Sequence, residues 1–384
     1  MAARKWLISL TVLMVVASAS PRAELPSDLE TVAAKPTLRS PPGRHWVWVN
    51  DFVFTHMADG QAHLVDADSG RYLGMLSTGY SFERVVVPRD HKVIYSPESY
   101  FSRGTRGTRT DVVTMYDPAT LNVLEEIAIP PKRSSNLPMM GNAELTDDDH
   151  FLLIYNFNGA SSVTVVDTVA RRFVGEVEIP GCALVYPVGP RSFFTLCGDG
   201  SAQLIDLDDA GAVLRQVRTS QLFDADHDPV TEKPVRVGAT WYFVSFDGRI
   251  IPVRYDAGSL SAGASWWLTS AAERKQGWRP GGMQQLAAHA GKNRLYAIMH
   301  QGGRDAHKDP GAAVWVYDLA SRQRVRRITL RGLTSSIQVS PDDAPLLYGI
   351  FIDRGALDVY DALDGQHLRT VGELGTSPSL LVLP

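Results

Sequence analysis

Short runs of apolar and β-branched residues recur along the chain, and seven of them end in an aspartate that is followed by a polar turn and a second apolar run. The successive aspartates are 51, 50, 39, 50, 62 and 43 residues apart, about 49 on average. A period of this length made of short strands is typical of β-propeller blades. The carboxylate can accept backbone N–H bonds from the turn that follows. The seven runs are His63–Asp66, Val113–Asp117, Val163–Asp167, Gln203–Asp206, Val253–Asp256, Val314–Asp318 and Leu357–Asp361.

A further pair of strands precedes several of these runs, for example Ala143–Leu145 and Phe151–Asn156 around an acidic turn. Each repeat therefore holds about four antiparallel strands. A helix start is predicted only at Thr269–Gln276, with the N-cap at its first or second residue. One such unit cannot bury both of its faces, whereas seven arranged radially can. The pattern predicts an all-β fold, a seven-bladed β-propeller of four-stranded antiparallel blades over residues 45–384.

The two ends of this region are complementary. The last full repeat ends near Val371, yet the apolar segment Ser379–Pro384 remains without a partner. The first repeat begins directly with His45–Val49 and lacks a leading strand. We therefore expect the C-terminal strand to join the N-terminal blade, which removes two open sheet edges.

The chain has two cysteines, Cys182 and Cys197, which lie at equal distances from a predicted hairpin turn at Gly189-Pro190. Antiparallel pairing about that turn places them opposite each other, close enough for a disulfide at a non-hydrogen-bonded position. A redox-active pair and a metal site are the alternatives. Because no Cys-x-x-Cys motif is present, the sequence favours a structural disulfide.

The N-terminus has the pattern of an export signal. Arg4 and Lys5 precede an apolar stretch from Trp6 to Ala17, and cleavage is predicted after Ala19 or Ala23. Twelve residues are too few to cross a bilayer, which needs about 20, although an N-terminal anchor is the alternative. Residues 1–19 are predicted to be the signal peptide and residues 24–44 an extended N-terminal arm. The mature protein is expected to be exported, with no membrane attachment.

Composition and motifs exclude several classes of function. With 38 Lys and Arg against 42 Asp and Glu, the formal net charge of −4 argues against a nucleic-acid partner. Walker, dinucleotide-binding, nucleophile-elbow and haem-attachment motifs are all missing. The ten histidines show no metal-ligand spacing, and the run Asp147–Asp149 lacks the ligand series of a calcium loop. The sequence therefore predicts no metal site and no self-sufficient active site.

Three arginines at three-residue spacing, Arg103, Arg106 and Arg109, follow Phe101 in a glycine-rich segment. Arginine forms bidentate pairs with carboxylates, so this segment could bind an acidic partner surface. The alternative is a flexible exposed loop.

A second unusual segment, Gly277–Gly282, directly follows the predicted helical turn. It contains Trp278, Arg279, Pro280 and Gly281. Tryptophan and arginine are enriched at interface hot spots, and glycine permits close backbone approach. The alternative is a tryptophan buried between blades.

Through these and other segments, the chain resembles the heavy, non-catalytic subunit of quinoprotein amine dehydrogenases, the methylamine and aromatic amine dehydrogenase family. The similar segments follow one another over nearly the whole mature chain. Residues 181–187 and 233–236 resemble the aromatic amine type more than the methylamine type. The segments that carry the resemblance are Val47–Asp51, Tyr100–Asp117, the Cys182–Cys197 hairpin, Glu273-Arg274, Gly277–Gly282, Gln284-Gln285, His307-Lys308 and Pro345–Tyr348.

The resemblance implies a periplasmic enzyme that oxidises primary amines to aldehyde and ammonia. In this family the catalytic group is a tryptophan tryptophylquinone in a separate light chain, and two electrons pass one at a time to a blue-copper protein such as azurin or amicyanin. The heavy chain binds no cofactor, occurs as two copies with two light chains, and helps to wall the substrate channel. The alternative is a stand-alone exported propeller, either a binding scaffold or a lactonase-like hydrolase.

The resemblance also implies roles for particular residues. A heavy-chain phenylalanine shortly after the Val-x-Val-Asn-Asp segment gates the substrate channel, which corresponds here to Phe54, with Phe52 as second choice. The predicted light-chain interface consists of Phe101, Arg103, Arg106, Arg109, Trp278, Arg279, Pro280 and Gly281.

Overall fold

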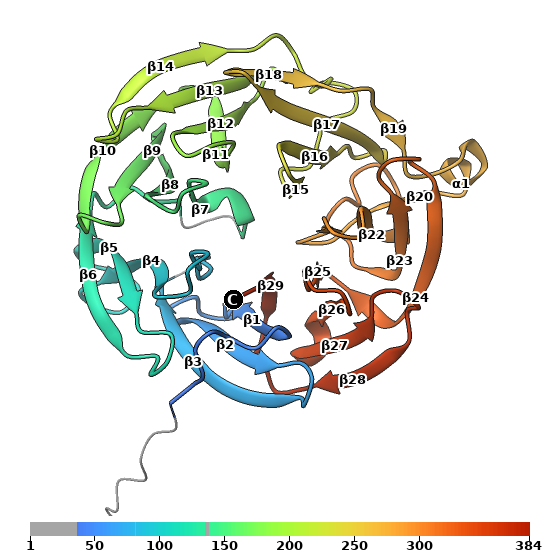
Figure 1. The fold of residues 1–384 in the computed structure, drawn as a ribbon, viewed down its shortest axis with the longest axis horizontal. Helices are drawn as coiled ribbons and strands as arrows, with labels where there is room; N and C mark the ends of the chain where they lie inside the picture. Colours follow the sequence, from blue (N-terminus) through green and yellow to red (C-terminus); the bar gives the residue numbers. More distant parts are fainter. Residues whose placement is uncertain (1–36, 81, 135–137) are drawn as a thin grey trace, which may run out of the picture. The chain divides into compact units, whose positions relative to one another are not determined.

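The structure, a computed structural model, describes residues 37–80, 82–134 and 138–384. These residues form seven antiparallel sheets around a common centre (Figure 1), which we number blades 1 to 7 in chain order. The predicted seven-bladed propeller is confirmed. The predicted signal peptide and residues 24–36 of the predicted arm lie outside the described residues.

The strands of each blade follow one another from the inner edge of the sheet to its outer edge. Blade 1 contains β29 (Pro378–Val382), β1 (Trp46–Asp51), β2 (Gly60–Asp66) and β3 (Arg71–Gly79); blade 2 contains β4 (Ile94–Phe101), β5 (Arg109–Tyr116) and β6 (Val123–Ile129); blade 3 contains β7 (Ala143–Leu145), β8 (Phe151–Asn158), β9 (Ala160–Asp167) and β10 (Arg172–Glu178); blade 4 contains β11 (Cys182–Pro187), β12 (Ser192–Cys197), β13 (Ala202–Leu207) and β14 (Val213–Arg218).

The other three blades are built from the inner edge outward in the same way. Blade 5 contains β15 (Val235–Val237), β16 (Thr240–Val244), β17 (Arg249–Asp256) and β18 (Ser259–Ala262), with β19 (Trp266–Trp267) also paired to β17; blade 6 contains β20 (Trp278–Pro280) and β21 (Leu286–His289), both paired to β22 (Arg294–Gln301), then β23 (Gly311–Asp318) and β24 (Arg324–Thr334); blade 7 contains β25 (Ser336–Val339), β26 (Leu346–Phe351), β27 (Ala356–Asp361) and β28 (His367–Val371).

Short helical turns accompany the strands. The helix α1 (Ala271–Lys275) is confirmed at the predicted place, with Ser270 as N-cap and Glu273 completing the capping box. Two 3-10 turns, η2 (Met140–Asn142) and η3 (Ile352–Arg354), precede β7 and β27. No helix in the described part of the chain is long and apolar enough to span a membrane.

Blade 2 differs from the predicted four-stranded pattern. Its inner position is occupied by a single bridge between Val86 and Tyr95 instead of a strand. The bridge cannot extend into a strand, because the Val85 N–H donates to the Asn50 side chain and Pro88 has no N–H to donate. The segment before β4 therefore stays irregular.

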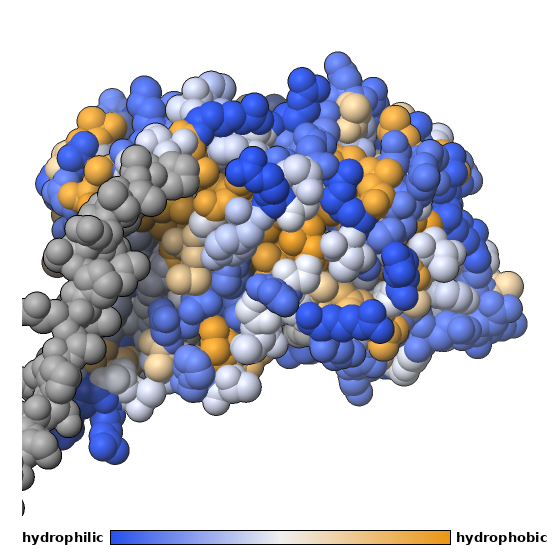
Figure 2. Space-filling model, turned by 90° about the horizontal axis from the view of Figure 1, so that it is seen from below, coloured by the Kyte–Doolittle hydropathy of each residue, from blue (hydrophilic) through white to orange (hydrophobic). Residues whose placement is uncertain are grey.

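Apolar clusters lie between neighbouring blades, because a single sheet has to bury its apolar faces against another element. One cluster joins blades 7 and 1, another joins blades 1 and 2, and a third joins blades 6 and 7. Strand β1 is buried along its whole length, whereas the outer strand β14 is exposed throughout. Figure 2 shows the outer edge of the ring, where apolar side chains are interspersed among hydrophilic ones.

Five of the seven predicted aspartate turns are confirmed, because the carboxylate accepts backbone N–H bonds from the following turn. Asp206 differs: it accepts from Ser192 and pairs with Arg215, while Asp208 caps the turn. Asp256 differs because Ala257 and Gly258 both have positive φ, so that the backbone forms the turn without a carboxylate. The confirmed aspartates are Asp66, Asp117, Asp167, Asp318 and Asp361.

The disulfide between Cys182 and Cys197 is confirmed, and the two residues are register partners in the β11–β12 hairpin. The predicted register holds at the cysteine end. Nearer the turn it shifts by one residue, because a bulge at Leu184, which has a φ of 64°, lies between Ala183 and Tyr186.

The predicted ring closure is also confirmed, since β29 pairs antiparallel with β1. Leu380, Leu381 and Val382 of β29 are buried. Leu381 packs in the cluster between blades 7 and 1, Leu380 clusters with Phe52 and Phe82, and Val382 packs in the cluster between blades 1 and 2. The Gln284 side chain is bonded to both the N–H and the carbonyl of Leu381. The C-terminal strand therefore completes blade 1 and the ring together.

Deletion of residues 377–384 is expected to lower the melting temperature by roughly 10 °C, because three buried apolar side chains contribute about 1.5–3 kcal/mol each and one edge of β1 is exposed. Deletion of residues 383–384 alone, which lie after β29, is the matched control and should change the melting temperature little. Thermal unfolding followed by circular dichroism measures both, and equal curves for the long deletion and the full chain would contradict the closure.

Candidate functional site

The direction of the strands divides the propeller into two faces. Turns between the second and third strands of each blade, together with the connections between blades, emerge on one face, which we call the connection face. The remaining turns, including all seven predicted aspartate turns and Asp147–Asp149, emerge on the other, the aspartate face. Phe54, the segment Phe101–Arg109 and the segment Trp278–Gly281 all lie on the connection face. The predicted gate and both predicted interface segments thus share one face.

Phe54 is presented by a strained turn after β1. Val53 has a φ of 45°, a value that β-branched residues rarely adopt. The buried Asp51 carboxylate holds the turn by accepting the N–H groups of Val53 at 2.9 Å, Thr376 at 2.7 Å and Ser377 at 2.9 Å. Backbone strain of this kind persists only where surrounding contacts determine the conformation, and it concentrates at functional positions.

The segment before β29 completes this arrangement. The Ser377 hydroxyl accepts the Phe54 N–H at 2.8 Å. Gly375 has a φ of 89°, and a Cβ atom there would lie 1.9 Å from Asp51 Oδ2, so only glycine fits. The position of Phe54 is therefore set by the same segment that closes the ring.

The Phe54 side chain is 41% exposed, whereas Phe52 is fully buried. The Phe54 ring lies 5.4 Å from the Phe82 ring and 6.2 Å from the Phe52 ring, centroid to centroid. Phe52 also contacts Phe82 at 5.7 Å. Of the two gate candidates, Phe54 is the one that faces solvent, and Phe52 and Phe82 support it from below.

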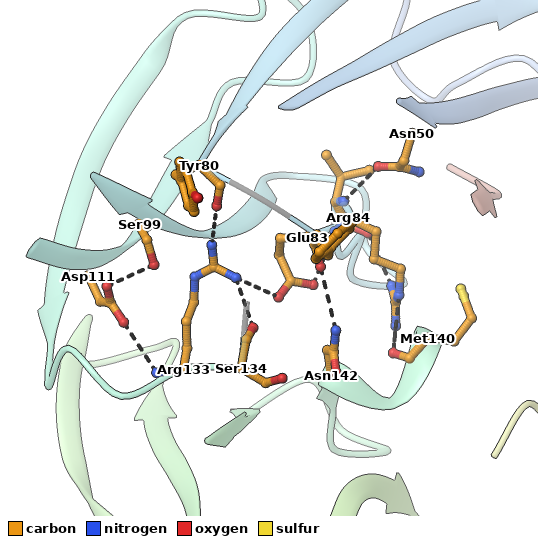
Figure 3. Close-up of polar contacts among 12 residues, drawn as sticks. Asn50, Tyr80, Glu83, Arg84, Ser99, Asp111, Arg133, Ser134, Met140 and Asn142 are labelled. Atoms are coloured by element: carbon orange, nitrogen blue, oxygen red, sulfur yellow. Dashed lines mark hydrogen bonds and ion pairs between the residues drawn. The ribbon is translucent and has the colours of Figure 1, made fainter. Parts of the chain in front are cut away.

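The segment that carries Phe82 is held by a buried ion pair (Figure 3). The Arg133 guanidinium contacts Glu83 at 3.4 Å and donates to the Tyr80 carbonyl at 2.7 Å and the Ser134 carbonyl at 3.2 Å. Both charged side chains are almost completely buried. Burial raises the pKa of Glu83 to about 7, against the opposing effect of Arg133, and burial lowers the pKa of Arg133.

The neighbouring Arg84 is bound on the other side of the segment. It pairs with Glu144 at 2.6 Å and donates to the carbonyls of Met140 and Ala143 at the start of blade 3. Irregular backbone between blades 1 and 3 is thus fixed by arginine side chains instead of strand pairing. This support was not predicted from the sequence, because adjacent charged residues such as Glu83-Arg84 normally indicate an exposed turn.

The arginine-rich segment is a hairpin between β4 and β5, and its residues have different environments. Arg103 and Arg106 are exposed, and Phe101 is half-buried against the Tyr80 ring at 5.1 Å. Arg109 forms a bidentate pair with the buried Asp111, with both N–O distances 2.7 Å, and donates to the Arg133 carbonyl. In this hairpin Arg103 and Arg106 are free to meet a partner, while Arg109 anchors its base.

Tyr80, Phe82 and Arg133 connect the predicted gate, Phe54, to the arginine hairpin. The Tyr80 ring contacts Phe101 and the Phe82 ring contacts Phe54. Trp278 is not part of this group, because it lies in blade 6, across the ring from blade 2 (Figure 1).

The Trp278 segment forms β20, which pairs with the end of β22. Trp278 is half-buried with its ring 5.1 Å from Trp315, and Arg279 lies 3.7 Å from Asp247. Pro280 and Gly281 are buried within the chain. Contact with a partner through this segment therefore depends on Trp278 and Arg279.

The other polar motifs are used in surface ion pairs. Asp147 pairs with Arg236, and Asp148 with Arg191, on the aspartate face. The His307 ring stacks on the Phe246 ring, with the two centroids 3.8 Å apart. The described ranges contain no group of three or more His, Cys, Asp or Glu residues able to hold a metal ion.

Fold and site together define a seven-bladed β-propeller that presents an exposed aromatic side chain and exposed cationic side chains on one face. A family model described as methylamine dehydrogenase heavy chain (MADH) matches residues 44–383, the entire propeller. The chain belongs to the methylamine dehydrogenase heavy chain family.

Individual relatives agree with this assignment. The methylamine dehydrogenase heavy chain of Methylobacillus flagellatus is 29% identical over 365 residues, which are 93% of this chain and 90% of the relative. That of Paracoccus versutus is 31% identical over 326 residues, 84% of this chain and 75% of the relative. A putative 6-phosphogluconolactonase from Bacteroides fragilis has a TM-score of 0.58 over 91% of this chain and 98% of its own, but with 11% identity it shares only the fold.

Replacement of Arg133 by Met is expected to destabilise the protein by about 3–5 kcal/mol, because it leaves the Glu83 carboxyl buried without its cation. Replacement of Glu83 by Gln should cost less, about 1–2 kcal/mol, since the amide can still accept a hydrogen bond. Urea unfolding at pH 7 compares the two variants with the double variant, which should recover part of the loss.

The loss of stability caused by Arg133→Met should also depend on pH. Because burial raises the pKa of Glu83 above its unfolded value, the folded state binds more protons between these two pKa values, and stability falls as pH rises through that window. Without Arg133 the pKa of Glu83 is raised further, because the cation that lowers it is gone. The loss of stability in Arg133→Met should therefore be larger at pH 8 than at pH 5. A deficit that is the same at both pH values would contradict this account of the pair.

Proposed function

We propose that this chain is the heavy subunit of a periplasmic quinoprotein amine dehydrogenase, which oxidises primary amines to aldehyde and ammonia and passes the electrons to a blue-copper protein such as azurin or amicyanin. The observation that carries this proposal is the similarity to methylamine dehydrogenase heavy chains over residues 44–383. In this role the chain is not itself catalytic. It binds the light chain and walls part of the substrate channel.

Tryptophan tryptophylquinone in the light chain supplies the electron sink for amine oxidation when the subunits are assembled. The residues of this chain fit a position beside that group instead of around it. Both cysteines are joined in the disulfide, and the exposed aromatic side chain of Phe54 stands on a rigid turn. An apolar ring held there excludes water from the channel mouth, which strengthens electrostatic interactions inside it, and limits the size of the amine that passes.

The connection face provides the proposed contacts for the light chain. Arg103 and Arg106 are unpaired with any carboxylate of the described residues and can form bidentate pairs with carboxylates of the partner. Trp278 and Arg279 offer a second contact in blade 6, on the other side of the centre. Two separated contacts on one face suit a partner that covers the middle of the ring, in an assembly of two heavy and two light chains.

The test of this function is co-expression with an exported, cysteine-rich light chain from the same source organism. The purified complex is expected to show a quinone absorption band that an added primary amine bleaches. A colourless monomer that retains no partner would instead favour a stand-alone propeller acting as a binding scaffold or lactonase-like hydrolase. The same assay with methylamine, butylamine and phenethylamine identifies the preferred amine.

Replacement of Phe54 by Ala is expected to change the ratio of kcat/KM values among methylamine, butylamine and phenethylamine, in favour of the longer amines, by about tenfold. The physical reason is the removal of an aromatic wall at the channel mouth, a contact of roughly 1–3 kcal/mol for a substrate side chain. Assembly with the light chain should be unchanged.

Phe157→Ala is the matched control for the gate variant, because Phe157 is also exposed, at 58%, and lies at the end of β8 on the same face. It should leave the specificity ratios as they are. Equal ratios in Phe54→Ala and the parent protein would remove Phe54 from the proposed role.

Replacement of Trp278 by Ala is expected to weaken light-chain association by at least about tenfold, as for an aromatic hot spot worth about 2 kcal/mol or more. Co-purification yield and the dissociation constant of the complex measure this. Since Trp278 also packs on Trp315, the melting temperature of the heavy chain alone is determined in parallel, and Arg106→Glu provides an exposed variant that cannot disturb the core. An unchanged dissociation constant in both variants would contradict the proposed interface.

A further inference from the structure

The centre of the ring contains a cavity that the proposed function does not use. Its volume is about 210 Å³, and the inner strands of blades 3 to 7 line it. An apolar cavity of about 150 Å³ is large enough to bind benzene, so this one is large enough for a small ring compound. Its wall contains aromatic and apolar residues, among them Tyr186, Trp241 and Leu286, as well as charged side chains.

The cavity wall includes a buried lysine, Lys233. Lys233 is 5% exposed, and its Nζ donates to the Gly282 carbonyl at 2.7 Å. No carboxylate in the described part of the chain forms an ion pair with it. Glu232 attracts its charge from the exposed side, and Lys308 opposes it. Burial lowers the pKa of Lys233 to about 8, so the amine is mostly protonated at neutral pH.

The other polar groups of the wall already have partners. Glu144 pairs with Arg84 at 2.6 Å, and Arg236 pairs with Asp147 through two contacts of 2.5 and 2.8 Å. The Trp241 N–H donates to the Pro187 carbonyl, and the Tyr186 hydroxyl donates to the Glu232 carbonyl. The cavity therefore carries a net charge of one positive unit, located at Lys233. An ammonium group buried without a counter-ion is unfavourable by several kcal/mol, which a bound anion would offset.

The cavity opens toward the aspartate face. It shares Met140, Glu144, Arg236, Trp241 and Gln338 with a second hollow that reaches the Asp147 turn. This opening is on the opposite side of the ring from Phe54 and the arginine hairpin. A small molecule could enter here whether or not a partner covers the connection face.

We propose that the central cavity binds a small organic monocarboxylate of about the size of benzoate, with the carboxylate at Lys233 and the apolar body against Tyr186, Trp241 and Leu286. The positive charge excludes amines, so this is not a second binding site for an amine substrate. The apolar wall distinguishes it from a site for inorganic anions, which gain nothing from the aromatic rings. The proposal does not depend on the amine dehydrogenase function.

The test uses the full mature chain, titrated with sodium benzoate at constant ionic strength and pH 7, and followed by calorimetry and by melting temperature. Benzoate is expected to bind and to raise the melting temperature. Benzamide, which has the same shape without the charge, and chloride, which has the charge without the ring, should each bind at least about tenfold more weakly.

Lys233→Met removes the charge while keeping the length of the side chain, and it should abolish benzoate binding. Lys92→Met is the matched control, because Lys92 is an exposed lysine, and it should bind benzoate as the parent does. Binding that is absent in the parent at about 10 mM benzoate, unchanged in Lys233→Met, or equally strong for chloride would overturn the proposal. The comparison of benzoate with benzamide uses the unaltered chain. It therefore tests whether binding requires the negative charge of the ligand even if Lys233→Met fails to fold.

Discussion

The Asp51 carboxylate joins the two ends of the propeller, and the conformation of the turn that carries Phe54 depends on it. It lies at the end of β1 and binds the backbone of the segment that leads into the C-terminal strand, as well as the turn that carries Phe54. A single buried carboxylate with three N–H donors thus links the segment that leads into the closing strand to the turn that carries an exposed side chain. Because the two segments share these hydrogen bonds, a shift of the Phe54 turn would also disturb the segment that leads into β29.

In the irregular segments beside blade 2, charged side chains also bind backbone groups directly. Where strand pairing is missing, the backbone carbonyls of Tyr80, Ser134 and Met140 accept hydrogen bonds from arginine side chains. A guanidinium group has five donors in a fixed plane, so one buried arginine can serve several carbonyls and a carboxylate together. The cost of burying that charge is offset by Glu83 and Asp111. Charged side chains therefore act here as substitutes for an inner strand.

The sequence was sufficient to predict features that depend on local pattern or on counting. The aspartate repeat gave the number of blades, the unpaired C-terminal strand gave the closure, and the equal spacing of Cys182 and Cys197 from the turn gave the disulfide. It was not sufficient for features made by distant contacts. The Glu83–Arg133 pair joins residues 50 positions apart through buried charges, and nothing in their sequence neighbourhoods distinguishes them from exposed residues. The missing inner strand of blade 2 also depends on a distant contact, the hydrogen bond from the Val85 N–H to the Asn50 side chain, and it was not predicted for the same reason.

The two faces of the ring have separate chemical character, and this separation follows from strand direction alone. Aspartates end the third strands of the blades, so their turns gather on one face together with the acidic turn at Asp147–Asp149. The turns between second and third strands and the connections between blades gather on the other face. The turns carry Phe54, Arg103 and Arg106, and a connection carries Trp278, without disturbing the repeat. The cavity at Lys233 opens toward the first face, whereas Phe54 lies on the second. A propeller can therefore bind a partner on its connection face while a small molecule retains access to its centre.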